Sequence, residues 1–206
     1  YGDREHSANL AFLTGFDPRF EEALLILDRQ GNRTLLVGNE CLGYLPDPAL
    51  NCRAVLHQDF SLLGQDRSKS PPLRNILQEA DIGPGKTVGC VGWKYFTSDT
   101  MEHAAQAIEI PAYLVDLFRD MCGDPQHVRN ATNLFMNPVD GLRLTNSVDQ
   151  IAQFEFAASH CSESLLSALQ AIQPGAVEYE IEAHLQSAGL PLSCHRMVSF
   201  GEKAKR

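Results

Sequence analysis

Apolar positions in the first part of the chain come in short runs separated by polar stretches. Ala8–Thr14 is one such run and is closed by Gly15; Ala23–Asp28 and Arg33–Val37 are two more, separated only by the polar segment Arg29–Asn32. Two apolar runs joined by a turn containing Gly and Asn predict a β-hairpin. We expect the run before the hairpin to be a strand as well.

The same alternation continues to residue 117. Strands are expected at 53–57, 87–91 and 113–117. Helices are expected between them. Residues 71–80 begin with a proline pair and have apolar residues on one helical face. Residues 101–108 follow the potential caps Ser98 and Asp99 and end before Pro111. Strands that alternate with helices predict an α/β layer with a mostly parallel or mixed sheet.

The pattern changes over Gly123–Asp140, which we expect to be a linker with a helical portion near His127–Phe135, and a long amphipathic helix follows it. Ser147 and Gln150 form a capping-box signature at its start, and Pro174-Gly175 breaks it. A second helix is expected over 178–188, ending at Gly189, and then a strand over 193–200. The apolar stripe of the long helix is Ile151, Phe154, Ala158, Cys161, Leu165, Leu169 and Ile172.

The elements at the two ends lack visible partners. Tyr1 resembles the last residue of a strand already under way, and the strand at 193–200 has no sheet to join. We therefore expect the chain to be a piece of something larger. Its 206 residues fit one domain and part of another, which we place at 1–135 and 136–206.

Charge and cysteine usage narrow the class of protein. The chain has 17 basic and 26 acidic residues and a net charge of -9, which argues against nucleic acid and anionic membrane as partners. No apolar run approaches the roughly 18–20 residues of a membrane span. The six cysteines form no C-x-x-C pair, Cys90 and Cys161 are expected to be buried, and we expect a reduced, cytoplasmic setting.

Few motifs for chemistry are present. There is no G-x-S-x-G and no G-x-G-x-x-G, and Gly83–Thr87 imitates the end of a P-loop but precedes a strand, which favours a tight turn. Of the seven histidines only His195, in the terminal strand, is a candidate for a ligand or catalytic role. The acidic run Glu178–Glu182 is better explained by the helix dipole than by a metal. Polar loop residues at Arg4–His6 and Arg19–Glu21 are weak candidates for binding.

Two groups of segments resemble one known family. Asn9–Phe16, Ala23–Leu27 and Leu35–Val37 resemble the "N-x-x-Y-L-T-G-F" segment and the hairpin of the N-terminal domain in the creatinase, prolidase and Xaa-Pro aminopeptidase family. Leu142–Ile151 resembles "L-R-x-x-K-S-x-x-E-I" at the start of its pita-bread catalytic domain. Pro174–Glu178 and Met197–Gly201 resemble the following "P-G-x-T-E" and "I-V-x-x-G" segments. The departures are Phe12 for Tyr, Asn146 for Lys, Gln150 for Glu and Val177 for Thr.

The resemblance implies a creatinase-like N-terminal domain with a mixed sheet flanked by helices, followed by a truncated α+β pita-bread domain. The parent would be a metal-dependent hydrolase acting on a peptide or on a small amide or amidine, with two divalent metal ions. Its five metal ligands lie downstream of the glycine that matches Gly201, so this chain is expected to carry no catalytic residue, no metal ligand and no cofactor.

The resemblance also gives the N-terminal domain a role in forming a homodimer and in restricting access to the active site. We select the loop residues Phe16, Arg19 and Phe20, together with His195, as candidates for a substrate-access or partner contact; an ordinary surface loop is the alternative. For the whole protein, a non-catalytic binding or scaffolding protein that keeps the fold, or an unrelated α/β domain, are the alternatives.

Overall fold

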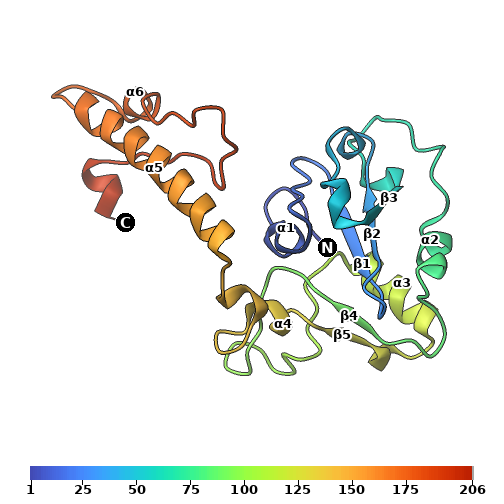
Figure 1. Cartoon of the computed structure of the whole chain (residues 1–206). Helices are drawn as coiled ribbons and strands as arrows, with labels where there is room; N and C mark the ends of the chain where they lie inside the picture. Colours follow the sequence, from blue (N-terminus) through green and yellow to red (C-terminus); the bar gives the residue numbers. More distant parts are fainter. Residues whose placement is uncertain (206) are drawn as a thin grey trace. The chain divides into compact units, whose positions relative to one another are not determined.

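The computed structural model describes residues 1–205 and divides the chain into two compact units, 1–144 and 145–206. Figure 1 shows the order of their helices and strands. The division falls after the 3₁₀ turn Leu142–Leu144, whereas the sequence pattern places the domain boundary at 135/136. Each unit is described by itself below. No helix among the described residues has both the length and the apolar character that crossing a bilayer requires.

The first unit contains the predicted hairpin. Strands β1 (Ala23–Leu27) and β2 (Arg33–Val37) pair antiparallel, with Ala23 opposite Val37. The Asp28 carboxylate holds the turn by accepting from the backbone N–H groups of Gln30 and Asn32, at 2.9 and 2.8 Å. Strand β3 (Cys52–Leu56), also predicted, adds to β2 in parallel. The sheet is therefore small and mixed, in the order β1-β2-β3.

A second, two-stranded sheet lies in the same unit. Strand β4 (Val88–Cys90) is the predicted run 87–91, and it pairs in parallel with β5 (Val128–Asn130). The connection between them contains helix α3 (Ala112–Cys122). Because parallel strands need a crossover connection, this helix supplies the return path. The unit is mixed α/β, as the sequence predicts.

Helices cover both faces of the three-stranded sheet (Figure 1). Helix α1 (Ala8–Thr14) lies on one side, and α2 (Leu73–Glu79) and α3 lie on the other. Side chains alternate across a strand, so β2 supplies Leu36 to the α2–α3 side and its neighbours to the α1 side. The α2–α3 core contains Leu24, Leu36, Phe60, Ile76, Leu77, Ile82, Cys90, Leu114, Val115, Phe118, Met121, Cys122 and Val128. The α1 core contains Leu10, Phe16, Ala23, Leu35, Val37 and Cys41.

Three predictions for this unit are wrong. Ala8–Thr14 is a helix, not a strand, and it ends at Gly15 with φ +65°. The predicted strand 113–117 lies inside helix α3, which starts after Pro111 and ends at Gly123 with φ +78°. The predicted helix 101–108 is a series of turns, in which His103 adopts φ +59°, a value that an α-helix does not allow.

The predicted helical portion near 127–135 is short. Helix α4 covers only Asn133–Met136, after strand β5. The expected tight turn at residues 83–86 is present, since Lys86 N–H donates to the Gly83 carbonyl at 3.1 Å. Further 3₁₀ turns lie at Cys41–Tyr44, Pro48–Leu50, Gln58–Phe60, Pro125–His127 and Gly201–Lys205.

The second unit is built on helix α5 (Val148–Ala171), whose capping box is confirmed. The Ser147 hydroxyl accepts from Gln150 N–H at 3.2 Å, and the Gln150 side chain accepts from Ser147 N–H at 2.8 Å. Helix α6 is shorter than predicted, Glu178–Glu182, and the predicted strand 193–200 has no strand geometry. Cys161, expected to be buried, is exposed.

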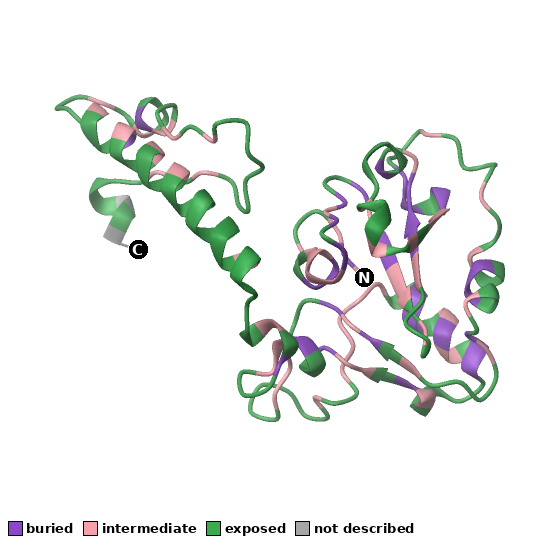
Figure 2. Ribbon diagram, viewed as in Figure 1, coloured by how far each residue is buried: buried purple, intermediate pink, exposed green. Residues whose placement is uncertain are grey.

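Most of this second unit is open to solvent, as Figure 2 shows for α5. Among residues 145–202 only Ala168 and Ile181 are buried apolar residues. The predicted stripe is present in sequence, but Phe154 is 60% exposed and Leu169 is 55% exposed. The helix prediction is thus right, and the expected burial of its stripe is not found.

Candidate functional site

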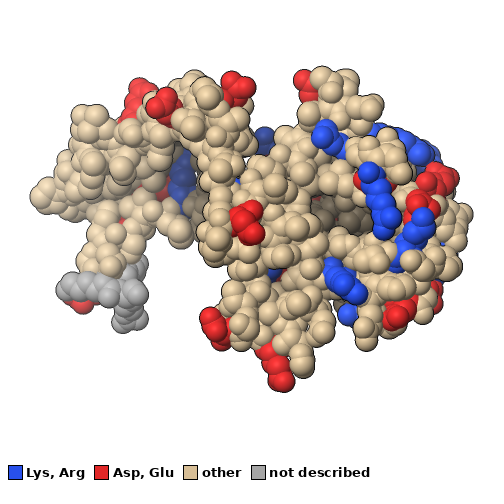
Figure 3. All heavy atoms as spheres, turned by 60° about the horizontal axis from the view of Figure 1, so that its bottom comes forward, with Lys and Arg blue, Asp and Glu red and all other residues tan. Residues whose placement is uncertain are grey.

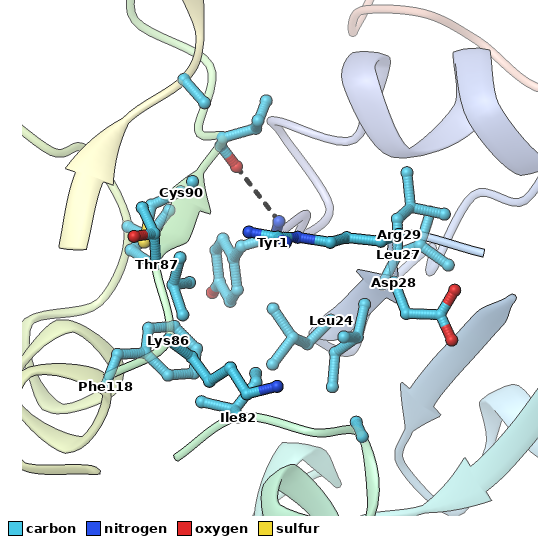
Figure 4. Close-up of a pocket in the computed structure, with 18 of the residues that line it drawn as sticks. Tyr1, Leu24, Leu27, Asp28, Arg29, Ile82, Lys86, Thr87, Cys90 and Phe118 are labelled. Atoms are coloured by element: carbon cyan, nitrogen blue, oxygen red, sulfur yellow. Dashed lines mark hydrogen bonds between the residues drawn. The ribbon is translucent and has the colours of Figure 1, made fainter. Parts of the chain in front are cut away.

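The first unit has a cavity of about 680 Å³ between β1 and β4, which we call the inter-strand cavity (Figure 4). Residues 24–30 line it along β1 and beyond, and residues 85–91 line it along β4. Leu10 and Leu13 of α1 contribute from one side, and Phe118 of α3 from the other. A cavity of this size is in the range that holds small ligands.

The chemistry available in the inter-strand cavity is limited. Cys90 is its only lining thiol among the described residues, and burial raises the pKa of that thiol to about 11. A buried neutral thiol is a poor nucleophile. Asp28, Arg29, Asp81 and Lys86 add charged groups to the lining. About half of the lining residues are leucine, isoleucine, valine or phenylalanine, and polar atoms contribute nearly as much of the lining surface as apolar ones, so the cavity has a mixed character.

The amino group of Tyr1 lies in this cavity. It donates to the Val91 carbonyl at 3.1 Å (dashed in Figure 4), and the next residue, Gly2, forms an antiparallel bridge with Ala23 of β1. Burial lowers the pKa of the amino group, although Cys90 and Glu109 act in the opposite direction. The chain therefore enters the unit between β1 and β4.

A second hollow of about 520 Å³, which we call the loop hollow, brings together loops that are far apart in sequence. It contains Arg4, Glu5, Phe20 and Glu21 from the two loop segments selected as weak binding candidates. The structure thus places these loops side by side. The full lining is Asp3, Arg4, Glu5, Phe20, Glu21, Glu22, Asp59, Phe60, Ser61, Leu62, Leu63 and Arg67.

Carboxylates outnumber cationic groups in the loop hollow. Arg67 is engaged by the wall itself, because it donates to the Ser61 carbonyl at 3.1 Å and lies 3.6 Å from the Asp59 carboxylate. Asp3 accepts from His6 N–H at 2.9 Å. The apolar rim is well exposed, with Leu63 at 94% and Phe20 at 50%. An acidic hollow with an apolar rim favours contact with cationic and apolar groups of a partner.

Glu21 is a buried carboxylate that sequence reasoning did not distinguish from its neighbours. It is 3% exposed and accepts from the backbone N–H of Glu40 at 3.2 Å and of Cys41 at 3.0 Å. A Cβ atom at Gly38 would lie 2.6 Å from its Oε2, so glycine makes room for it. Glu21 fixes the base of the loop hollow, and it is structural rather than free for a ligand.

The candidate contact residues separate into three environments. Phe16 is 3% exposed in the α1 core and stacks on Tyr44 with ring centroids 5.7 Å apart, so it packs the fold. Arg19 and Phe20 are at the surface, and Arg19 has φ +61°. His195 lies in the second unit, where its Nδ1 is 3.9 Å from the Cys194 thiol.

His57 is the histidine with the least ordinary environment. It is 1% exposed, neither ring nitrogen has a hydrogen-bond partner, and its ring meets Phe60 edge-on at 4.7 Å. Burial lowers the pKa of its imidazole, with Asp59 acting in the opposite direction. Its position directly after the apolar run 53–56 is the only sequence signal for this burial.

Over 1–205 no group of three or more His, Cys, Asp and Glu side chains is arranged to hold a metal ion. On the face of the first unit that Figure 3 shows, Lys and Arg side chains are interspersed with Asp and Glu side chains. No family model, curated protein or solved structure matches the chain.

Proposed function

We propose that the chain is the N-terminal part of a two-domain hydrolase of the creatinase, prolidase and Xaa-Pro aminopeptidase type. In this proposal the first unit is the non-catalytic N-terminal domain, and residues 145–206 begin the pita-bread catalytic domain. The two divalent metal ions would bind to residues outside this chain. The chain by itself would then serve in dimer formation and in restricting access to the active site.

The observation that carries this proposal is the exposed apolar stripe of α5. This capped helix of 24 residues has Phe154, Leu165 and Leu169 more than half exposed, so the described residues leave its apolar face largely uncovered. Burying one such side chain stabilises a protein by about 1.5–3 kcal/mol. The proposal supplies the missing surface, since the remainder of a catalytic domain would cover this stripe.

The resembling segments fall at element boundaries in the second unit, which agrees with the proposal. Leu142–Ile151 spans the cap and first turn of α5. Pro174–Glu178 contains the break and the first residue of α6. Phe12 and Asn9, from the N-terminal resembling segment, lie on α1 rather than on a strand.

The loop hollow is the proposed partner contact of the first unit. Arg19 and Phe20 lie in the loop that leads to it, and Phe20 and Leu63 present apolar surface at its rim. In a homodimer of the parent this surface would face the partner's active site. A peptide or a small amide or amidine would be the substrate of that site.

The test compares this chain with its longer parent. Metal content and dipeptide hydrolysis are measured on both; we expect two metal ions and hydrolysis in the parent and neither in the chain. In the parent, Leu169→Glu should lower the thermal midpoint, while Phe20→Ala should weaken dimerisation and leave folding intact. Hydrolysis by residues 1–206 alone would contradict the proposal.

A non-catalytic scaffolding protein is the second candidate, and the same α5 stripe favours it. If a second copy of the chain covers the stripe, the chain alone forms a dimer. Asn146 and Gln150, where the family pattern has Lys and Glu, allow for a member that lost the chemistry. A parent that dimerises through α5 and binds no metal would establish this alternative.

A further inference from the structure

A buried asparagine joins three segments of the first unit that are far apart in sequence. Asn9 lies on helix α1 and is 6% exposed. Its Nδ2 donates to the carbonyl of Gly92, which follows β4, at 2.6 Å, and its Oδ1 accepts from Nη1 of Arg143 at 2.9 Å. Asn9 therefore connects α1 both to the end of β4 and to the last 3₁₀ turn of the unit.

The amide of Asn9 matches the chemistry of its two neighbours. The Gly92 carbonyl is an acceptor and the Arg143 guanidinium is a donor, and an amide side chain carries one group of each kind. A carboxylate in its place would turn an acceptor toward the Gly92 carbonyl. An apolar side chain would remove the partner of both groups, and a buried polar group without a partner is costly. The position thus favours an amide.

The turn that carries Arg143 also packs against α1 by other contacts. Gly141 N–H donates to the Asn137 carbonyl at 2.9 Å, and a Cβ atom at Gly141 would lie 2.6 Å from that oxygen, so the backbone here is tightly folded. Just before this segment, the rings of Phe135 and Phe12 meet edge-on with centroids 6.3 Å apart. The end of the first unit is therefore held on α1 by one apolar and one polar contact.

Arg143 lies next to the boundary between the two units. Residues 144–146 separate it from Ser147, the N-cap of α5, and the division of the chain falls after Leu144. Hinges in proteins are a few residues at the ends of elements that absorb changes of φ and ψ. The bond from Arg143 to Asn9 fixes the point at which the chain leaves the first unit and enters such a segment.

We propose that Asn9 and Arg143 form a latch, which holds the last turn of the first unit on α1 and restrains movement at residues 144–146. Their role in catalysis rests on the proposed function: in a hydrolase whose first unit restricts access to the active site, both are positioning residues for that unit and neither touches the substrate. The latch itself involves only contacts within the first unit, so it stands without the hydrolase assignment.

The first test measures the latch in residues 1–206. Arg143→Met removes the guanidinium, and Arg129→Met is the matched control, since Arg129 is exposed and donates only to the nearby Gln126 carbonyl in the described structure. We expect Arg143→Met to speed hydrogen exchange at Leu144 N–H, and cleavage at 144–147 by a protease of broad specificity, by about tenfold or more. The control should change neither.

A double-mutant cycle assigns this effect to the contact with Asn9. Asn9→Ala combined with Arg143→Met should speed exchange at Leu144 no more than Asn9→Ala alone, because both changes remove the same bond. Independent, multiplied effects would overturn the latch, as would unchanged exchange and cleavage in Arg143→Met. That half-buried substitution decides the matter by itself if Asn9→Ala does not fold.

The second test uses the longer parent and separates the latch from its role. We expect Arg143→Met to raise kcat/KM for a longer peptide relative to a dipeptide, because access is less restricted, and to leave kcat for the dipeptide unchanged. A parallel loss for both substrates would overturn the positioning role. If the parent hydrolyses no peptide, the proposed function and the positioning role both fail, and the exchange result still decides whether the latch exists.

Discussion

The two units differ in how far their apolar side chains are buried. In the first unit, short elements of three to eleven residues produce two closed cores, with Leu35, Leu36 and Leu77 fully buried. In the second, the longest and most regular pattern of the chain leaves α5 exposed along its length. Periodicity therefore identifies a helix, but a second surface is needed to bury its stripe.

The largest expected effect comes from a matched pair of leucine substitutions. Leu77→Ala should cost about 2–5 kcal/mol of unfolding free energy, because Leu77 is 0% exposed and truncation leaves a cavity. Leu169→Ala, at a side chain that is 55% exposed, should cost less than about 0.5 kcal/mol. Urea unfolding followed by circular dichroism measures both. Equal costs would mean that α5 is packed in solution.

A smaller effect is expected at Glu21, which ties β1 to the turn after β2. Glu21→Ala leaves the buried N–H of Cys41 and the partly buried N–H of Glu40 without their acceptor and should cost about 1–3 kcal/mol. Glu21→Gln keeps one acceptor oxygen and should cost less. Gly38→Ala is the steric control, because its Cβ would displace the same carboxylate. If Glu21→Ala unfolds like the unsubstituted chain, the hydrogen bonds accepted by the Glu21 carboxylate do not contribute to stability.

A substitution in the capping box of α5 tests a local contribution to stability in the second unit. Ser147→Ala removes one acceptor for the first turn of α5 and should cost that helix about 0.5–2 kcal/mol. Hydrogen exchange at residues 148–152 should become faster. The unfolding midpoint seen by Trp93 fluorescence, in the first unit, should stay the same; a shift of that midpoint would show that the units unfold together.

The smallest expected effect is a pH dependence from His57. Burial lowers the pKa of its imidazole, so between that pKa and about 6.5 the unfolded chain binds a proton that the folded chain does not. Stability should therefore fall as the pH decreases below about 6.5. His57→Phe should be equally stable near pH 8 and should lose part of this dependence. Unfolding midpoints from about pH 5 to pH 8 test it, and identical slopes would exclude His57 as the source.

Local signals in the sequence account for the elements that were predicted correctly. The Asp28–Asn32 turn and the Ser147–Gln150 box each place specific donors and acceptors a few residues apart, so no distant contact is needed to read them. The Ala8–Thr14 error has a local cause too. A seven-residue apolar run fits a buried helix or a strand equally well, and its Ala and Leu content favours the helix.

Helix α3 was missed although signals for it were present. Pro111 before it and Gly123 after it are helix boundary residues, and Leu114, Val115, Phe118 and Met121 follow helical spacing. The sequence prediction covered only residues 113–117 of this helix, and assigned them to a strand.

The two hollows could not be predicted at all, because they depend on loops and strands that are distant in sequence. The prediction of a strand at 193–200 is wrong, because a strand needs the edge of a neighbouring strand to pair with.

The six cysteines divide between the units in a way that affects their reactivity. All are free thiols. In the first unit Cys41, Cys90 and Cys122 are buried and Cys52 is half-buried, whereas Cys161 and Cys194 in the second unit are exposed. Burial raises the pKa of the Cys41 thiol to about 12, so it reacts only when the unit opens. An alkylating reagent will thus modify the second unit at once and will record, through its slower reaction with the first, how often that core opens.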